Sequence, residues 1–468
     1  MTVAARRYIS FVTYLTLVLT SRSTLAQVTS DKGSVSTIFV HVNVVPMDVD
    51  RILPDQTVLI ENGVIKAIGP SIAIPKGSKV IDCHGTEFLS PGLADMHVHS
   101  DTSRDMAVFL ANGVTSVLNM GDARSQFMTR TRPAVNRGDL PGPHVYAAFM
   151  IDGSPEYGEF FVTNPSEARA VVHLAKTNGY DFIKVYVDLS PECFEALAEE
   201  GRAEGIPIVG HGVSSIGLER QIAAGQMLVA HTEEYFYTVF TKPGSKLTDA
   251  TPSTDQIPAA IAFTKHYGAF VTADLNTYAT IARQWGKPAI VQDSLRKPEV
   301  RYLDPDNRIG WDNSRYQGKT GDLSSRVEFL KIFTKALSDA GVPLVTGTDS
   351  PPIPGLVPGF SLHEDLLALH EAGLTNYQVL SAATRTPGEF IRRAHPDSEP
   401  FGTIAAGNRA DLILTDSNPL EDLSILKKPV GVMARGHWYT ASDLRKLLDD
   451  VAQQYESSFT PSCAHDAQ

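Results

Sequence analysis

Residues 91–100 read "PGLADMHVHS", and this stretch decides the fold that we expect. A Pro-Gly turn precedes a short apolar run that ends in His97 and His99, two residues apart. Because side chains alternate along a strand, both imidazoles would point to the same side. The stretch therefore predicts a buried strand that brings two histidines to one site.

Seven further apolar runs follow, separated by helical stretches. One of these stretches places Val327, Leu330, Phe333 and Leu337 at three- and four-residue steps, which predicts a helix with one buried face. Eight strand–helix repeats predict an α/β fold, a (β/α)8 TIM barrel. The eight expected strands are residues 93–99, 114–120, 144–149, 181–187, 206–211, 227–232, 268–275 and 342–349.

The regions on either side of the barrel have a different pattern. Residues 27–90 hold short β-branched runs between Gly, Pro, Asn and Asp, which is typical of antiparallel strands. Residues 400–440 return to this pattern, and we expect a C-terminal helix and tail over 441–468. The barrel is therefore expected over residues 91–399.

The first 26 residues have the order of a secretory signal peptide. Arg6 and Arg7 precede an apolar run, and small and polar residues lead to a cleavage site after Ala26. The apolar run of about 13 residues is short for a membrane span, so we expect no stable membrane anchor. The mature chain is expected to be secreted or periplasmic.

Composition excludes several other classes of protein. The 468 residues carry 41 basic and 53 acidic side chains, a net charge of -12, and no long basic run, so no nucleic-acid partner is expected. The three cysteines, Cys83, Cys193 and Cys463, are too few and too scattered for a disulfide framework or a cysteine metal site.

Three more potential metal ligands end barrel strands. His211 ends the fifth, His231 lies at the end of the sixth and Asp349 ends the eighth. Catalytic residues of such barrels stand at the carboxyl ends of the strands, so these side chains should meet His97 and His99. Imidazole and carboxylate ligands suit zinc or a similar divalent ion. The sequence therefore predicts a metal site built from these five residues.

Lys184 interrupts the otherwise apolar fourth strand. A bare ammonium group there is costly to bury unless it is paired. One interpretation is an ordinary charge that pairs with an acid or reaches the mouth of the barrel. The other is carboxylation of the amine by carbon dioxide, which gives a carbamate able to bridge two metal ions.

These motifs together resemble those of the amidohydrolase superfamily. The resemblance is to the imidazolonepropionase-like branch, which includes metal-dependent Xaa-Pro dipeptidases and related carboxypeptidases, and it covers nearly the whole mature chain. It implies that residues 27–90 and 400–440 form one composite β-sandwich beside the barrel. The motifs are "PGLADMHVHS", "DFIKV", "VGHG", "AHTEEY", "TGTDSPPIPGLVPGFSLHEDL" and "FGTIAAGNRADLILTDSNPLEDL".

The resemblance also implies two divalent ions, with zinc expected. His97, His99 and Asp349 would hold the more buried ion, and His211 and His231 the second. Lys184, as an N6-carboxylated lysine, would bridge both ions.

A mechanism follows from the charges of such a site. Two divalent ions would lower the pKa of a bridging water and make hydroxide available, while Asp349 would act as general base and then as general acid toward the leaving amine. This predicts hydrolysis of an amide bond in a dipeptide-like or N-acyl amino acid substrate with a free carboxylate. The alternative is a mononuclear deaminase or cyclic-amide hydrolase with Glu234 as acid–base residue, but Lys184 favours two ions.

The segment 276–320 is expected to be a long loop that covers the barrel mouth. Its arginines could clamp a substrate carboxylate, and its aromatic residues could cover an apolar group. Self-association into a homo-oligomer is compatible with the sequence. The candidate side chains are Arg283, Arg296, Arg301, Arg308, Trp285, Trp311 and Tyr316.

Overall fold

The structure is a computed structural model that describes residues 36–121, 123–156, 160–241 and 251–458. The described residues from 36 to 458 belong to one compact unit. The signal peptide expected over residues 1–26 lies outside the described residues. Within the described ranges, no helix combines the length and the apolar character needed to cross a bilayer.

Eight parallel strands form a closed barrel, which confirms the predicted fold. They pair in chain order, and each overlaps one of the eight expected runs. The last strand meets the first through Met96 N–H, which donates to Thr346 O at 2.8 Å, and through a parallel bridge between Val98 and Ser350. The strands are β6 (Leu93–Val98), β7 (Val114–Asn119), β8 (His144–Ile151), β9 (Phe182–Val185), β10 (Ile208–Gly210), β11 (Gln226–Val229), β12 (Phe270–Thr272) and β13 (Leu344–Val345).

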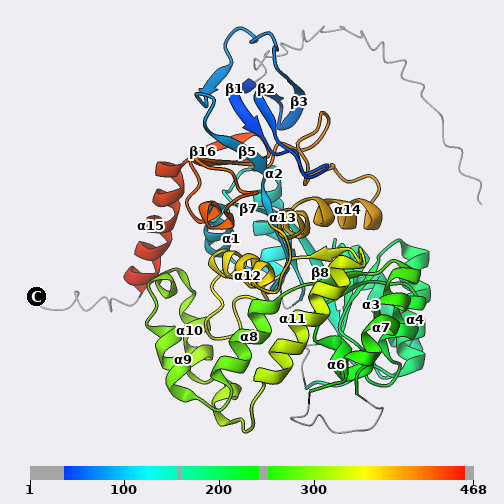
Figure 1. Ribbon diagram of the computed structural model, residues 1–468. Helices are drawn as coiled ribbons and strands as arrows, with labels where there is room; N and C mark the ends of the chain where they lie inside the picture. Colours follow the sequence, from blue (N-terminus) through cyan, green and yellow to red (C-terminus); the bar gives the residue numbers. More distant parts are fainter. Residues whose placement is uncertain (1–35, 122, 157–159, 242–250, 459–468) are drawn as a thin grey trace, which may run out of the picture. The chain divides into compact units, whose positions relative to one another are not determined.

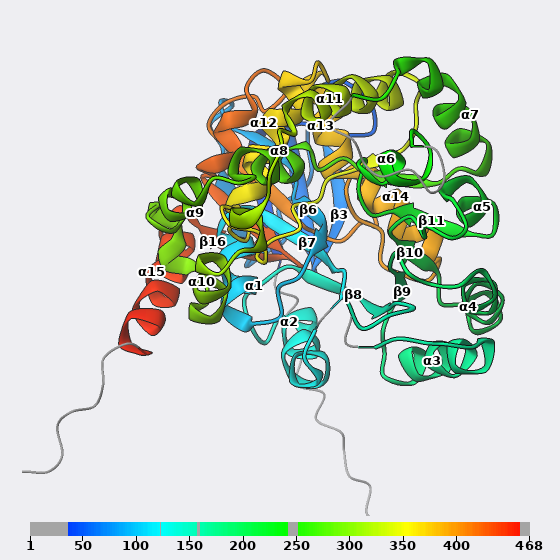
Figure 2. The ribbon, with the colours of Figure 1, turned by 90° about the horizontal axis from the view of Figure 1, so that it is seen from below.

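Helices surround these strands, as Figure 2 shows. In the predicted helix α11, Leu330, Phe333 and Leu337 are buried, as expected from their spacing. The helices around the barrel are α1 (Ser103–Ala111), α2 (Arg132–Arg137), α3 (Pro165–Thr177), α4 (Pro191–Glu204), α5 (Leu218–Ala223), α6 (Glu234–Thr238), α7 (Ile257–Tyr267), α11 (Ser324–Asp339), α12 (Phe360–Glu371), α13 (Asn376–Ala383) and α14 (Arg385–Ala394).

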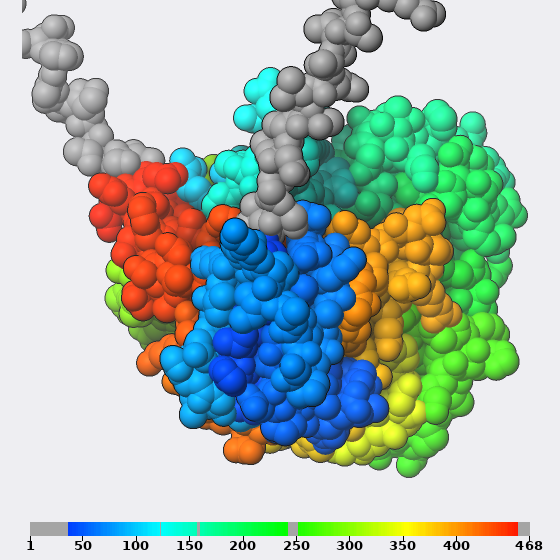
Figure 3. Space-filling view, turned by 90° about the horizontal axis from the view of Figure 1, so that it is seen from above, coloured from blue at the N-terminus to red at the C-terminus, as the bar shows by residue number. Residues whose placement is uncertain are grey.

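A second eight-stranded sheet combines strands from residues 36–91 and 412–440 (Figure 1). In Figure 3 the blue N-terminal part lies beside the orange and red C-terminal part. The order of the sheet is β16-β15-β14-β5-β1-β2-β3, with β4 paired to β1, and β5 pairs with β14 in antiparallel register. β5 continues through Gly92 directly into β6. The strands are β1 (Ser36–Val44), β2 (Leu53–Glu61), β3 (Val64–Gly69), β4 (Lys79–Asp82), β5 (Phe88–Pro91), β14 (Leu412–Thr415), β15 (Gly431–Ala434) and β16 (His437–Thr440), and α15 (Ala441–Ser458) follows them.

The expectation of a long loop over residues 276–320 was wrong, because this segment is mostly helical. Each helix has only one to three turns, so no long apolar period marks it. Within this segment Val300, Leu303 and Trp311 are buried together, and they pack with Val357 from a later part of the chain. The elements are α8 (Leu275–Gln284), α9 (Pro288–Leu295), η3 (Pro298–Tyr302), α10 (Pro305–Asp312) and η4 (Arg315–Gly318).

Candidate metal centre

The six candidate ligands lie at the carboxyl ends of barrel strands. Three lie in or directly after β6 and β9, and the others follow β10, β11 and β13 within a few residues. The barrel therefore brings together side chains that are up to 252 positions apart. The residues are His97, His99, Lys184, His211, His231 and Asp349.

His97 is at the centre of the cluster and is fully buried. Its Nε2 atom lies 3.3 Å from Asp349 Oδ1 and 3.4 Å from Lys184 Nζ. The same Asp349 Oδ1 lies 3.1 Å from His99 Nε2. Four of the six predicted residues are thus in direct contact.

His231 links this group to His211. Its ring centroid is 4.3 Å from that of His97 and 5.0 Å from that of His211. Potential ligand atoms of His97, His231 and Asp349 all lie within 4.8 Å of one another. His231, which the resemblance assigned to the second ion, therefore also lies beside two residues assigned to the first.

Two buried carboxylates orient His211 and His231. Glu234 Oε1 lies 2.5 Å from Nδ1 of His211, and Asp274 accepts a hydrogen bond from Nδ1 of His231. Such a carboxylate fixes the tautomer, because Nδ1 keeps the proton and Nε2 is left for a metal. The role of Asp274 was missed from the sequence, although its position at the end of the seventh predicted strand was a usable signal.

Backbone carbonyls orient the other two histidines in the same way. Nδ1 of His97 lies 3.2 Å from Ala230 O, and Nδ1 of His99 lies 3.3 Å from Gly121 O. A carbonyl oxygen can only accept, so these Nδ1 atoms carry the hydrogen. All four imidazoles therefore present Nε2 as the remaining ligand atom.

Two glycines allow this close packing. A Cβ atom on Gly210, just before His211, would lie 2.3 Å from Val185 O. A Cβ atom on Gly347, two residues before Asp349, would lie 2.7 Å from the Cβ of His97. Any larger residue would push these strand ends apart and move the adjacent ligands.

Electrostatics leaves suitable ligands unprotonated. Burial, with help from His231 and Lys184, lowers the pKa of His97 well below its usual value, and burial lowers the pKa of His211 to about 4. Burial alone would raise the pKa of Asp349, but hydrogen bonds and charge from His97 and His99 hold this pKa well below its usual value. Neutral imidazole and ionised carboxylate are the forms that bind metal.

The pKa of His231 is shifted in the opposite direction. Burial alone would lower its pKa, but the nearby Asp274 carboxylate outweighs this effect and raises the pKa of His231 to about 10. Binding of a metal at this imidazole would therefore release a proton.

A cavity of about 370 Å³ opens onto the cluster. Tyr316, expected from the sequence to cover the mouth, lines it, and so does Arg315, which sequence reasoning missed. None of the four arginines proposed from the sequence lines this cavity, since Arg283, for example, lies in α8 and faces another one. The lining residues are His99, Met150, Lys184, Tyr186, His211, Gly310, Asn313, Ser314, Arg315, Tyr316, Asp349, Pro352 and Ile353.

Glu234 does not line this cavity. It is 1% exposed, and its second carboxylate oxygen, Oε2, accepts a hydrogen bond from Gly212 N–H at 2.9 Å. With Oε1 bonded to His211, both oxygens have protein partners. This position suits a residue that orients His211 rather than the acid–base residue of a deaminase.

Comparison with known proteins is consistent with this arrangement. Ochratoxinase of Aspergillus niger is 22% identical over 88% of this chain and 87% of its own length. Two solved structures share the fold: a bottromycin amidohydrolase (TM-score 0.68, 24% identity, 90% of each chain) and a Xaa-Pro dipeptidase with bound methionine in the active site (TM-score 0.63, 20% identity, 86% of this chain and 100% of the other).

The family follows from a match over most of the chain. The model of the amidohydrolase family matches residues 88–439. This range contains the whole barrel, all six candidate ligands and the C-terminal strands of the second sheet. The chain therefore belongs to the amidohydrolase family.

Proposed function

We propose that this chain is a binuclear, metal-dependent hydrolase that cleaves the amide bond of a small substrate with a free carboxylate. The substrate class is a dipeptide or an N-acyl amino acid. The observation that carries the proposal is the position of Lys184, whose Nζ lies 3.4 Å from His97 Nε2 in the buried floor of the cluster.

The donor set fits divalent ions. Four imidazoles that keep the hydrogen on Nδ1 and one ionised carboxylate match the borderline-to-hard donors that zinc accepts. His97, His99 and Asp349 would hold one ion, and His211 and His231 the other. Bound ions would supply Lewis acidity and a water molecule of lowered pKa.

Lys184 supports two ions rather than one. It is 1% exposed, and an ammonium group in that position would add positive charge to a site built for cations. Carboxylation replaces this charge with a negative one and adds two oxygen ligands. Lys184 contacts His97 and lines the same cavity as His211, which supports the proposal that these oxygens bridge the two ligand groups.

The protein's own side chains would complete the chemistry. Asp349 lines the cavity with an ionised carboxylate, so it is suited to accept a proton during attack and to return it to the leaving amine. Arg315 lines the same cavity as Asp349, and its planar guanidinium group is suited to bind a carboxylate bidentately. Tyr186 and Tyr316 provide apolar faces beside it.

The relatives support the reaction type. A Xaa-Pro dipeptidase and a bottromycin amidohydrolase share the fold, and their names denote hydrolysis of peptide and amide bonds. Their identity to this chain is too low to transfer a substrate. The proposal on the substrate therefore depends on the carboxylate-binding chemistry of Arg315.

Metal counting on a Lys184→Ala variant tests the proposal. We expect the wild type to bind two ions per chain and the variant to lose one of them with most of the activity against a library of dipeptides and N-acyl amino acids. Added bicarbonate or a short carboxylic acid should restore part of this activity. Lys176→Ala on the exposed helix α3 is the control, and two ions in Lys184→Ala with full activity would refute the carbamate bridge.

A further inference from the structure

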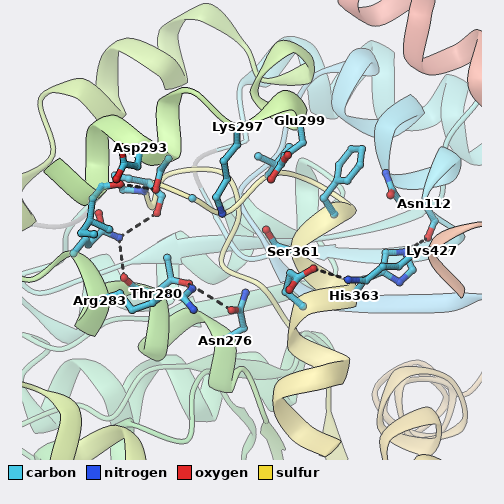
Figure 4. A pocket seen from close by; sticks show the side chains of 18 residues that line it. Asn112, Asn276, Thr280, Arg283, Asp293, Lys297, Glu299, Ser361, His363 and Lys427 are labelled. Atoms are coloured by element: carbon cyan, nitrogen blue, oxygen red, sulfur yellow. Dashed lines mark hydrogen bonds and ion pairs between the residues drawn. The ribbon is translucent and has the colours of Figure 1, made fainter. Parts of the chain in front are cut away.

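A second cavity, larger than the one over the metal centre, lies between α8, α9 and α12 (Figure 4). Its volume is about 550 Å³, and it shares no lining residue with the mouth cavity. Figure 4 shows Lys297 reaching toward its middle beside Glu299, with Arg283, Thr280 and Asn276 on the opposite side. This cavity has no part in the proposed reaction.

Three charged side chains of its wall have no charged partner among the described residues. Arg283 donates a hydrogen bond to Thr280 Oγ1 at 2.6 Å, but within the described ranges neither it nor Lys297 or Glu299 forms an ion pair. By contrast, Glu364 and Lys427, on the same wall, neutralise each other at 2.7 Å. The cavity therefore offers two cations and one carboxylate to a ligand.

Gln284 contributes a buried acceptor. The side chain is 1% exposed, and its Nε2 donates to the carbonyl oxygens of Thr280 and Pro354 at 3.2 and 3.1 Å. Two carbonyl partners fix which end of the amide is nitrogen. Oε1 is thereby left as an acceptor without a partner in the described part of the chain.

His363 contributes a second buried acceptor. It is 3% exposed, and its Nε2 lies 3.0 Å from the carbonyl oxygen of Asn112, so this nitrogen carries the hydrogen. Burial lowers the pKa of His363 to about 4, which keeps the ring neutral and Nδ1 an acceptor. Nδ1 also has no partner among the described residues. Buried acceptors of this kind normally meet a donor.

We infer that this cavity binds a small zwitterion of the α-amino acid type. Its carboxylate would pair with Arg283 and Lys297. Its ammonium group would lie against Glu299. A carboxylate and an ammonium group on one small molecule match the two cations and the acid that form no ion pair among the described residues, while the acceptors of Gln284 and His363 show that this wall also has buried polar atoms without a protein partner in the described part of the chain.

Calorimetric titration of the metal-loaded protein with glycine, L-leucine and L-phenylalanine tests this inference. We expect at least one of them to bind, and its N-acetyl and carboxamide derivatives to bind at least tenfold more weakly, since each lacks one charge. Equal binding of the N-acetyl derivative would overturn the zwitterion assignment, and no binding of any amino acid would overturn the site.

Substitutions in the wall of the cavity test where the amino acid binds. Arg283→Gln should weaken binding about tenfold or more, and so should a second variant, Lys297→Gln, at an exposed residue. Arg296→Gln is the control and should leave binding unchanged, because the Arg296 guanidinium pairs with Asp293 at 2.6 Å. Loss of binding in Arg315→Gln instead would place the amino acid at the mouth cavity and refute the second site. Because binding is measured without turnover, this result is independent of whether the proposed amide hydrolysis is correct.

Discussion

The Oε1 atom of Glu234 lies 2.5 Å from Nδ1 of His211, and both side chains are buried. Burial alone would raise the pKa of Glu234, but the charge and hydrogen bond of His211 lower it. The carboxylate is therefore ionised beside the imidazole. This pair fixes the direction in which His211 presents its other nitrogen.

Glu234→Gln should weaken metal binding about 10- to 100-fold without unfolding the protein, because the amide keeps the shape but loses the charge that orients His211. Competition with a chelator measures the affinity. Glu204→Gln is a matched control, since Glu204 lies 3.4 Å from His173 in an exposed pair far from the barrel mouth. Equal metal affinity in wild type and Glu234→Gln would contradict the orienting role.

Asp349→Asn should lower kcat about a hundredfold or more while most of the metal is retained, because asparagine keeps one ligand oxygen but cannot accept the proton. Steady-state kinetics together with metal analysis checks this. Asp416→Asn, at an exposed turn, is the control. Near-normal turnover of Asp349→Asn would mean that another group handles the proton.

Arg315→Gln should lower kcat/KM about tenfold or more for substrates with a free carboxylate. The same substrates with the carboxylate converted to an amide should show little change, since they have no charge to lose. Arg301→Gln, whose guanidinium packs 4.7 Å from the ring of Tyr302, serves as control. A similar loss with both kinds of substrate would assign Arg315 a structural role.

His363 should make the metal-free protein less stable at acidic pH. Its pKa is about 4 when folded and 6.5 in the unfolded chain, so the unfolded state binds the extra proton between these values and stability rises with pH across this window. On going from pH 7 to 4.5, the wild type should lose roughly 2–3 kcal/mol more unfolding free energy than His363→Gln. Urea unfolding at both pH values measures this, and equal losses would exclude the effect.

We propose that the chain is exported and that the mature protein begins at Gln27. Amino-terminal sequencing of protein recovered from its native cell should therefore read Gln27 first. Recovery of a chain that retains Met1 would refute cleavage.

The sequence was sufficient to predict the barrel and the meeting of the histidines. The period of two in a strand and the alignment of carboxyl ends in a barrel place His97, His211 and Asp349 at one end without any other knowledge. The position of Arg315 could not be predicted in this way. It depends on how several short helices of residues 275–318 fold back over the barrel, and no local pattern encodes the packing of such helices against distant loops.

Asp274 is an intermediate case. Its place after the seventh strand was visible, but its partner could not be chosen from the sequence, because several strand ends were equally near in the expected barrel. Only the packed structure shows that its carboxylate accepts a hydrogen bond from Nδ1 of His231.

The pairing of β5 with β14 has a consequence for synthesis on the ribosome. β5 leads straight into the first barrel strand, yet its partner is made more than 320 residues later. Until then the nascent chain carries an unpaired, aggregation-prone strand edge. Early termination before residue 412 would therefore leave this edge of β5 unpaired, and a holdase that covers it would protect the chain until residues 412–415 emerge.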